Sequence, residues 1–306
     1  MPPPACCLAC LRLAAAVFCA AMSSRPSSLV GVFDSGVGGL SVLREIRHAL
    51  PQQDLLYVAD SAHAPYGDRS GDFIEQRAGF ITDYLLQAGA SVIVVACNTV
   101  TSVAVRMLRE RCPLPVVAME PAIKPAALNT RSGVIAVLAT SQTLASDNVS
   151  RLCAEYGEGA GVKVMLQACP GLVECVERLE LDSPATRQLL AGYIDPLLAA
   201  GADNIVLGCT HYPFLRDSIR ALVGDAVQIV DPAAAVAKEV MRKLQAIDVK
   251  HGVESTPDQA GQVGQVGQVG KVGKEGQVRF VTSDTLSHAQ RVMQYLWAAP
   301  VQVEAL

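Results

Sequence analysis

Two segments of this 306-residue chain share one pattern, and that pattern restricts the fold to few classes. Each segment begins with a continuous apolar run rich in β-branched residues, Val92–Val95 in one and Ile205–Leu207 in the other. One small residue follows each run, and then a cysteine, Cys97 or Cys209. Such runs are typical of strands buried on both faces, as in parallel sheets covered by helices. The pattern therefore predicts an α/β fold.

A helical pattern follows each cysteine, at Val103–Arg111 and at Phe214–Val223. Both cysteines are therefore expected at the carboxyl end of a parallel strand, which is where open α/β sheets bind their ligands. Backbone N–H groups and the helix dipole at that position favour anions, including a thiolate or a substrate carboxylate. A single cysteine there would be interpreted as a small buried apolar residue. Two in matching places, each followed by polar residues, indicate a pair.

Alternating strand and helix patterns extend over the rest of the chain and occur twice, with one cysteine strand in each half. This arrangement predicts two pseudo-symmetric, doubly wound α/β lobes with mainly parallel sheets and an active site in the cleft between them. We expect the first lobe to comprise residues 29–117 and 231–306, and the second to comprise 118–230. The expected strands outside the two cysteine segments are Leu29–Phe33, Leu55–Ala59, Val116–Met119, Gly133–Leu138, Val162–Leu166, Ala226–Val230 and Val278–Thr282. The expected helices are Leu40–Leu50, Asp72–Ala88, Pro184–Ala200, Ala233–Ala246 and Leu286–Trp297. Another helix is expected after Ala139–Thr143, and one that contains Glu174 and Glu177 is expected after Ala168–Pro170.

Two segments fall outside this alternation. Residues 252–277 contain a glycine–glutamine repeat with little apolar content, and we interpret them as a flexible insertion. Residues 1–28 are interpreted as a disordered leader or as a start codon assigned too far upstream, with Met22 as the alternative start. A secretory signal is the other interpretation, but Arg12 interrupts the apolar run and no basic residue precedes it.

The bulk composition excludes several classes of protein. A net charge of −4 and an isoelectric point near 5.8 disfavour nucleic-acid binding, which requires a basic face. Four of the ten cysteines lie in the first nineteen residues, where Cys7-x-x-Cys10 is interpreted as incidental. The other six show no paired spacing typical of a zinc site, so we expect no metal. The leader is too short and interrupted to span a membrane. We therefore expect a cytoplasmic protein with reduced thiols.

A glycine-rich loop, Asp34–Gly39, follows the first expected strand. A dinucleotide-binding loop would have glycine at the position of Ser41, and Asp34 would place a negative charge beside the phosphates. A plain tight turn is a second interpretation. The third is a loop of backbone donors with an acidic side chain held above them.

The chemistry of two matched thiols narrows the choice of reaction. A nucleophilic cysteine enzyme needs one thiol and a histidine base, and a disulfide would not need polar surroundings. Two thiols on opposite faces of a small substrate suit a reaction that removes a proton from one face and returns one to the other. A thiol can do this because its pKa, about 8.5 when unperturbed, can be brought near the working pH. Asp34 and His211 are candidates for controlling the position of the protons.

Four motifs resemble those of the glutamate racemases, within the cofactor-independent aspartate/glutamate racemase superfamily. They are FDSGVGG at Phe33–Gly39, APYGDR at Ala64–Arg69, ACNT at Ala96–Thr99 and GCTHYPFL at Gly208–Leu215. Glu120–Pro121, Ala168–Pro170 and Asp231–Pro232 add support. The resemblance covers Leu29 to about Ala246 and resumes at Val278.

The resemblance implies interconversion of L- and D-glutamate by proton transfer between two cysteines without a cofactor, supplying D-glutamate for peptidoglycan synthesis. It implies that Cys97 takes the proton from D-glutamate and Cys209 from L-glutamate. The implied catalytic residues are Cys97, Cys209, Asp34, His211 and Glu177, with Glu174 as an alternative to Glu177. The implied substrate-binding residues are Asp34, Ser35, Pro65, Tyr66, Gly67, Asn98, Thr99, Thr140, Thr210 and His211.

Two other classes stay open at this point. One is a related superfamily enzyme such as an aspartate racemase, and the other is a non-catalytic two-lobed binding protein. The partner expected is glutamate alone, without nucleic acid or membrane, and a homodimer is an open option.

Overall fold

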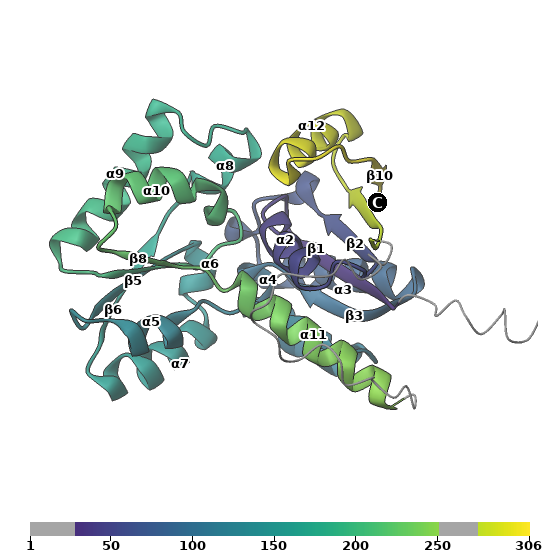
Figure 1. The fold of residues 1–306 in the computed structure, drawn as a ribbon, viewed down its shortest axis with the longest axis horizontal. Helices are drawn as coiled ribbons and strands as arrows, with labels where there is room; N and C mark the ends of the chain where they lie inside the picture. The colour runs from purple at the N-terminus through teal and green to yellow at the C-terminus, as the bar shows by residue number, and fades with distance from the viewer. Residues whose placement is uncertain (1–27, 251–274) are drawn as a thin grey trace, which may run out of the picture.

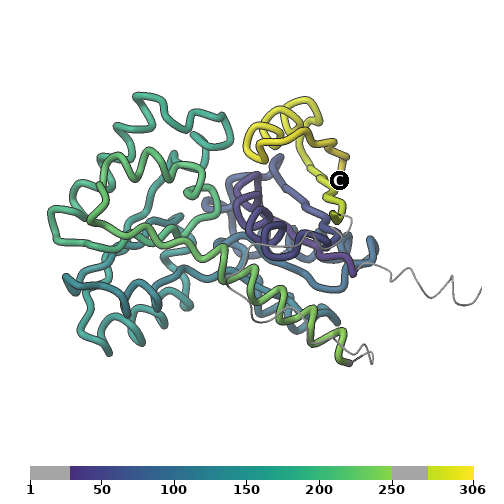
Figure 2. The backbone as a smooth tube through the Cα atoms, in the orientation of Figure 1, coloured from purple at the N-terminus to yellow at the C-terminus, as the bar shows by residue number. Residues whose placement is uncertain are grey.

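Two parallel β-sheets, each covered by helices, make up residues 28–250 and 275–306, which are the residues that this computed structural model describes (Figure 1). Every strand pair in both sheets is parallel. The predicted α/β fold with parallel strands in two sets is thereby confirmed. Figure 2 follows the chain from the first sheet to the second and back.

The first sheet has six strands in the order β10-β9-β2-β1-β3-β4. Alternate residues of its central strand enter two different cores, Val30 and Val32 on one face and Phe33 on the other. Burial on both faces explains why the strand sequences are continuously apolar. The strands are β1 (Leu29–Asp34), β2 (Leu55–Ala59), β3 (Ala90–Val95), β4 (Val116–Ala118), β9 (Val278–Thr282) and β10 (Val303–Ala305).

The second sheet has four strands in the order β6-β5-β7-β8. Its central strand is likewise buried on both faces, with Ala136 and Leu138 in one core and Ile135 and Val137 in another. The strands are β5 (Val134–Ala139), β6 (Lys163–Ala168), β7 (Asn204–Leu207) and β8 (Gln228–Val230). The strand β8 forms one edge of this sheet.

Helices cover both sheets, and several begin at a capping side chain. Ser70, Ser146 and Ser183 each accept a hydrogen bond from a backbone N–H in the first turn of the helix that follows. The helices are α2 (Leu40–Ala49), α3 (Gly71–Gln87), α4 (Asn98–Arg111), α5 (Ile123–Asn129), α6 (Ser141–Leu144), α7 (Asp147–Tyr156), α8 (Leu172–Glu177), α9 (Pro184–Ala199), α10 (Arg216–Val223), α11 (Ala233–Lys250) and α12 (Leu286–Trp297). Short 3₁₀ turns are η1 (Ser61–His63), η2 (Tyr66–Asp68), η3 (Glu158–Ala160) and η4 (Tyr212–Leu215).

One hydrophobic core extends across both halves of the protein. It contains Val37 and Leu40 from the first half together with Val176 and Tyr212 from the second. Because this core is shared, the halves pack against one another close to the strand ends that carry the predicted site. The division into lobes at 117/118 and 230/231 stays a prediction, and β4 ends one residue beyond the first of these boundaries.

The structure differs from the sequence prediction at several element boundaries. The helix after Cys97 begins at Asn98 rather than Val103, because Cys97 itself is the N-cap residue with extended backbone angles. The short strand β10 and the helix α5 were not predicted. No helix within the described residues is long and apolar enough to cross a membrane.

Parts of two sequence predictions fall on residues 1–27 and 251–274, which lie outside the described residues. Of the predicted insertion, residues 275–277 are described. There the Gly276 N–H donates to the Pro51 carbonyl at 3.0 Å, and the Gln277 N–H donates to Asp54 Oδ1 at 2.8 Å. These bonds tie the end of the segment to the turn before β2.

Candidate active site

Each of the two predicted cysteines lies just beyond the end of a strand. Cys97 follows β3 after Ala96 and precedes the first turn of α4, while Cys209 follows β7 after Gly208. Both are free thiols and nearly buried, with 4% and 6% of their surface exposed. The two parallel sheets therefore deliver one buried thiol each.

A small cavity of about 20 Å³ lies between the two thiols. That volume holds about one water molecule, so the walls must move apart to admit an amino acid. The lining residues come from both halves of the protein and are Ser35, Pro65, Gly67, Cys97, Asn98, Thr99, Thr140, Val173, Gly208, Cys209, Thr210 and His211.

The side chain of Asn98 marks this cavity as a binding site for a polar molecule. Asn98 is 3% exposed, and neither its Oδ1 nor its Nδ2 has a hydrogen-bond partner among the described residues. Leaving both a buried donor and a buried acceptor unpaired is unfavourable, so a ligand with both kinds of group is expected here.

Asp34 connects the two strand ends that carry the thiols. Its Oδ1 accepts from the Ser35 N–H at 2.7 Å, and its Oδ2 accepts from Thr210 Oγ1 at 3.0 Å. Ser35 Oγ lies 3.4 Å from Cys97 Sγ. Asp34 is fully buried, and burial raises its pKa even though His211 and its hydrogen bonds act in the opposite direction. A carboxylate in this state is stabilised by any additional positive charge that enters the cavity.

The environment of Cys97 opposes ionisation of the thiol in the free protein. Burial raises the pKa of Cys97 well above its ordinary value, and the neighbouring charge of Asp34 raises it further. This differs from the expectation that the site would bring the thiol pKa toward neutrality. A substrate ammonium beside Asp34 and Cys97 would supply the missing positive charge.

Cys209 is paired with a histidine that is itself held by a carboxylate. Cys209 Sγ lies 3.8 Å from His211 Nδ1, and His211 Nε2 lies 2.8 Å from Glu177 Oε1. Burial lowers the pKa of His211, but the bonds to Cys209 and Glu177 outweigh it and leave the pKa well above the ordinary value. The raised pKa favours the cationic imidazole, and a cation beside Cys209 suits the stabilisation of a thiolate. Glu177, rather than Glu174, makes this contact.

The glycine-rich loop Asp34–Gly39 packs against the same two side chains. A Cβ on Gly36 would lie 2.2 Å from Glu177 Oε1, and one on Gly38 would lie 2.3 Å from His211 Nδ1. Any larger residue at these positions would displace the histidine or its carboxylate. The Val37 N–H donates to Glu177 Oε1 at 3.0 Å. The loop thus provides a backbone donor, but to Glu177 rather than to a phosphate.

Three threonine hydroxyls meet across the junction of the two halves. Thr99 Oγ1 lies 3.0 Å from Thr140 Oγ1 and 3.3 Å from Thr143 Oγ1. Thr140 Oγ1 donates to Thr143 Oγ1 at 2.9 Å. Hydroxyls both donate and accept, so this cluster can exchange its mutual bonds for bonds to a carboxylate.

The side chain of Tyr66 does not line the cavity, although its neighbours Pro65 and Gly67 do. Its hydroxyl donates to Asp60 Oδ2 at 2.5 Å. Arg77 holds the same carboxylate through two bonds, Nε to Oδ2 at 2.8 Å and Nη2 to Oδ1 at 2.7 Å. Burial raises the pKa of Asp60, and the bonds from Arg77 and Tyr66 more than reverse that effect, so the pKa is lowered. Arg77 and Asp60 thus hold the loop whose backbone faces the site.

The structure brings most of the predicted site residues to one place. Asp34 and Glu177 lie behind the lining and contact it, whereas the side chain of Tyr66 contacts Asp60. The other predicted residues line the cavity directly. Val173 and Gly208 also line it and were not predicted, nor were the supporting residues Thr143 and Arg77. The position of Gly208 beside Cys209 was a usable signal, whereas nothing in the local sequence marks Arg77.

No group of three or more histidine, cysteine or acidic side chains with the geometry to hold a metal ion occurs within residues 28–250 and 275–306. The described cysteines outside the site are Cys112, Cys153, Cys169 and Cys175, and all four are free thiols.

Comparison with known proteins assigns the chain to a family. Residues 30–240 match the model of the Asp/Glu/Hydantoin racemase family. The chain belongs to this family, and the resemblance predicted from the four motifs is confirmed.

Individual relatives of this chain are glutamate racemases. A glutamate racemase of Ectopseudomonas mendocina is 56% identical over 216 residues, which cover 70% of this chain and 81% of the relative. A glutamate racemase of Pseudomonas aeruginosa is 44% identical over 282 residues, 92% of this chain and 98% of the relative. The crystal structure of Escherichia coli glutamate racemase in complex with L-glutamate and the activator UDP-MurNAc-ala has 30% identity and a TM-score of 0.74. The match covers 92% of this chain and 98% of the Escherichia coli chain.

Proposed function

We propose that this chain is a glutamate racemase that moves a proton between the two faces of the substrate Cα through Cys97 and Cys209, without a cofactor. One observation carries the proposal: a buried thiol from the end of a strand in each sheet lines the same small cavity. The names of the relatives support glutamate as the substrate. The role in peptidoglycan synthesis, the cytoplasmic location and the homodimer option stay predictions.

The chemistry runs as one proton removal and one proton delivery. One cysteine reacts as a thiolate, takes the Cα proton and becomes a thiol, while the C–H electron pair stays on the substrate. The thiol on the opposite face then gives its proton to Cα and becomes the thiolate. Atoms and charge balance, and the two cysteines have exchanged protonation states. In the predicted assignment, Cys97 is the base for D-glutamate and Cys209 for L-glutamate.

The surrounding residues make the intermediate state accessible. The α-proton of an amino acid is far less acidic than a thiol, so the site must stabilise the carbanion-like state electrostatically and exclude water. In this proposal the charge of Asp34, which lies behind the lining, attracts the substrate ammonium, and the ammonium offsets the effects that raise the pKa of Cys97. The cationic His211 is placed to stabilise the thiolate of Cys209. In this proposal Asn98 Nδ2 and the threonine hydroxyls donate to the substrate carboxylates, and Asn98 Oδ1 accepts from the ammonium group.

Racemisation by the purified protein tests the proposal. The protein is incubated with L-glutamate, and in a separate reaction with D-glutamate, without added pyridoxal phosphate or metal and in the presence of a chelator. We expect the circular dichroism signal of glutamate to decay toward zero in both reactions, starting with opposite signs, because the two enantiomers have equal free energy. L-Aspartate serves as the matched substrate control. Turnover of aspartate without glutamate would favour an aspartate racemase, and no turnover of either would favour a binding protein.

A further inference from the structure

A second and larger cavity lies apart from the two thiols. It has a volume of about 380 Å³, which is within the range typical of small-molecule sites. Strands β7 and β8, helix α5 and the first residue of α10 line it from one half. The turn after β8, the start of α11 and helix α2 complete it. None of the residues assigned to racemisation lines it.

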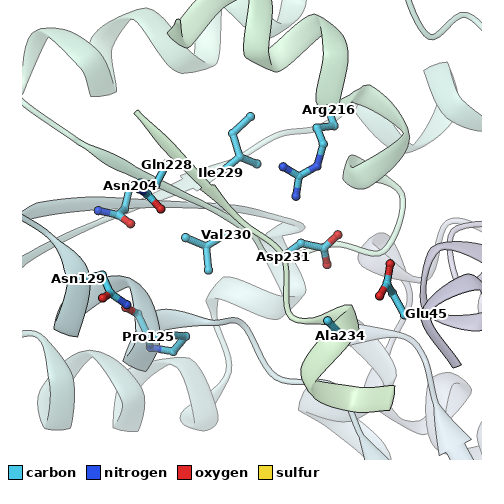
Figure 3. A pocket seen from close by; sticks show the side chains of 10 residues that line it. All are labelled: Glu45, Pro125, Asn129, Asn204, Arg216, Gln228, Ile229, Val230, Asp231 and Ala234. Carbon is cyan, nitrogen blue, oxygen red and sulfur yellow. The ribbon is translucent and has the colours of Figure 1, made fainter. Parts of the chain in front are cut away.

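The cavity has a charged end and an amide end (Figure 3). Arg216, Asp231 and Glu45 gather at the charged end, with two carboxylates for one guanidinium. Asp231 is also held in place, since its Oδ1 accepts from the Ala233 N–H at 2.9 Å. Burial and the nearby charge of Glu45 raise the pKa of Asp231, while Arg216 lowers it. This end therefore favours a positively charged group.

The amide end presents the amide side chains of Asn204 and Asn129. Asn204 is 1% exposed, and its Nδ2 donates to Asp203 Oδ1 at 2.8 Å. Asp203 also accepts from the N–H groups of Arg131 and Ser132, so its carboxylate is fixed and the Asn204 amide cannot reverse. The remaining atom, Asn204 Oδ1, is buried at the cavity wall without a hydrogen-bond partner in the described part of the chain.

A second amide, that of Asn129, lines the same end of the cavity. Asn129 Nδ2 donates to the Pro125 carbonyl at 2.7 Å, which leaves its Oδ1 as an acceptor. The apolar side chains of Pro125, Ile229 and Val230 lie along the wall. Acceptors thus occur at both ends of the cavity, with an apolar stretch of wall available to carbon atoms.

We propose that this cavity binds a small aliphatic molecule with an ammonium group at each end. One ammonium group lies against Glu45 and Asp231, and the other donates to Asn204 Oδ1 and Asn129 Oδ1. The methylene chain between them packs against the apolar wall. Arg216 is available for a carboxylate, so the same chemistry fits either a linear diamine or a basic amino acid.

Isothermal titration calorimetry with 1,4-diaminobutane tests the proposal on the full-length protein. The probe is unlike glutamate, and its binding is measured without turnover, so failure here leaves the proposed racemase activity untouched. We expect one saturable site. n-Butylamine, which satisfies only one end of the cavity, should bind about ten-fold more weakly.

Three variants test whether residues at the charged end and at the amide end of the cavity bind the ligand. Glu45→Gln and Asp231→Asn each remove one charge and keep the shape, and Asn129→Ala removes an exposed acceptor. Each should weaken 1,4-diaminobutane about five-fold or more. The matched control is Glu110→Gln, the same change at an exposed residue of α4 that pairs with Arg106 and does not line the cavity. It should leave the affinity unchanged. Circular dichroism spectra establish that each variant is folded.

A second titration distinguishes the two sources of this chemistry. If L-ornithine binds more tightly than 1,4-diaminobutane and loses that advantage in Arg216→Gln, the ligand is a basic amino acid. If 1,4-diaminobutane binds at least as tightly and Arg216→Gln does not weaken it, the ligand is a diamine. The proposal is overturned if neither compound binds saturably. It is equally overturned if Glu110→Gln weakens binding as much as Glu45→Gln, since that result means general attraction of cations to an acidic surface.

Discussion

His211 and Glu177 lie 34 residues apart in the chain and are joined by a bond of 2.8 Å between Nε2 and Oε1. The same Oε1 accepts from the backbone of Val37, so the carboxylate also connects the histidine to the glycine-rich loop of the other half. This contact fixes both the orientation and the charge of the imidazole. The same ring contacts Cys209 through its other nitrogen, at 3.8 Å from Sγ.

The first prediction concerns Glu177→Gln. The variant should lower the pKa of His211, because a carboxylate stabilises the imidazolium more than an amide does. A group with a raised folded-state pKa favours folding fully below its unfolded pKa, near 6.5, and loses that contribution as the pH rises through the folded value. As the pH rises, the contribution of His211 to the free energy of unfolding should therefore be lost at a lower pH in the variant than in the parent protein. NMR titration of the imidazole, together with urea unfolding across pH, measures both effects.

Glu174→Gln is the control for this variant, because Glu174 lies in the same short helix. It should change neither the histidine pKa nor the turnover rate, whereas Glu177→Gln should reduce turnover about ten-fold or more. Equal effects of the two variants would show that general acidity of α8, and not the contact with His211, is responsible.

The second prediction separates stability from activity at Asp34. Asp34→Asn should abolish most turnover while raising the melting temperature at neutral pH, because burial raises the pKa of Asp34 and the native state disfavours its ionised form. For an acid with a raised folded-state pKa, stability falls as the pH rises above the unfolded value, about 3.9. The gain in the variant should thus be small near pH 3.5 and should grow toward neutrality. Calorimetric melting across this range measures it, and a variant less stable than the parent at pH 7 would contradict the assignment.

The third prediction concerns the support of the loop that contains Pro65 and Gly67. Arg77→Lys keeps the charge but cannot form the two parallel bonds to Asp60, so the loop should lose its fixed position. We expect KM for glutamate to rise about ten-fold and kcat to change less, because the loop binds substrate rather than transferring protons. Arg69→Lys, in the same segment but exposed and over the ring of Phe73, is the control. A lower melting temperature with unchanged KM would mean that Arg77 has only a structural role.

The sequence predicted the parallel α/β architecture and the positions of both thiols, because these depend on local patterns. Continuous β-branched runs are recognisable as buried strands without knowledge of their partners, and the residues after them are fixed by the strand ends. The strand β10 was missed because Val303–Ala305 is short, and only one of its three residues is strongly apolar. Helix α5 was missed because its first turn follows Pro121 and lacks a capping side chain.

Contacts between residues that lie far apart in the chain could not be predicted from local sequence patterns. The two bonds from Arg77 to Asp60 join residues 17 apart, and the contact of Thr210 with Asp34 joins residues 176 apart. The choice between Glu174 and Glu177 needed the orientation of α8, which the sequence leaves open. The raised pKa of Cys97 depends on its burial beside Asp34, a property of the folded protein rather than of either motif.

The fourth prediction addresses the thiols one at a time. Cys97→Ser and Cys209→Ser should each reduce racemisation about 10³-fold or more, because a hydroxyl is too weak an acid to serve as the base. Cys112→Ser, at another buried free cysteine, is the control and should retain turnover. Circular dichroism should show a native fold in all three variants. Full activity in either active-site variant would exclude the two-thiol mechanism.

The most direct test of transfer between two thiols is the isotope content of both glutamate enantiomers after a short reaction in D₂O. A thiol on the far face has exchanged with solvent and never contacts the hydrogen removed from the near face. Product formed in either direction should therefore carry deuterium at Cα, while substrate recovered at low conversion should carry almost none. Mass spectrometry after chiral separation measures both. Heavy labelling of recovered substrate at low conversion would contradict the account, because it would show one cysteine removing and returning protons on the same face.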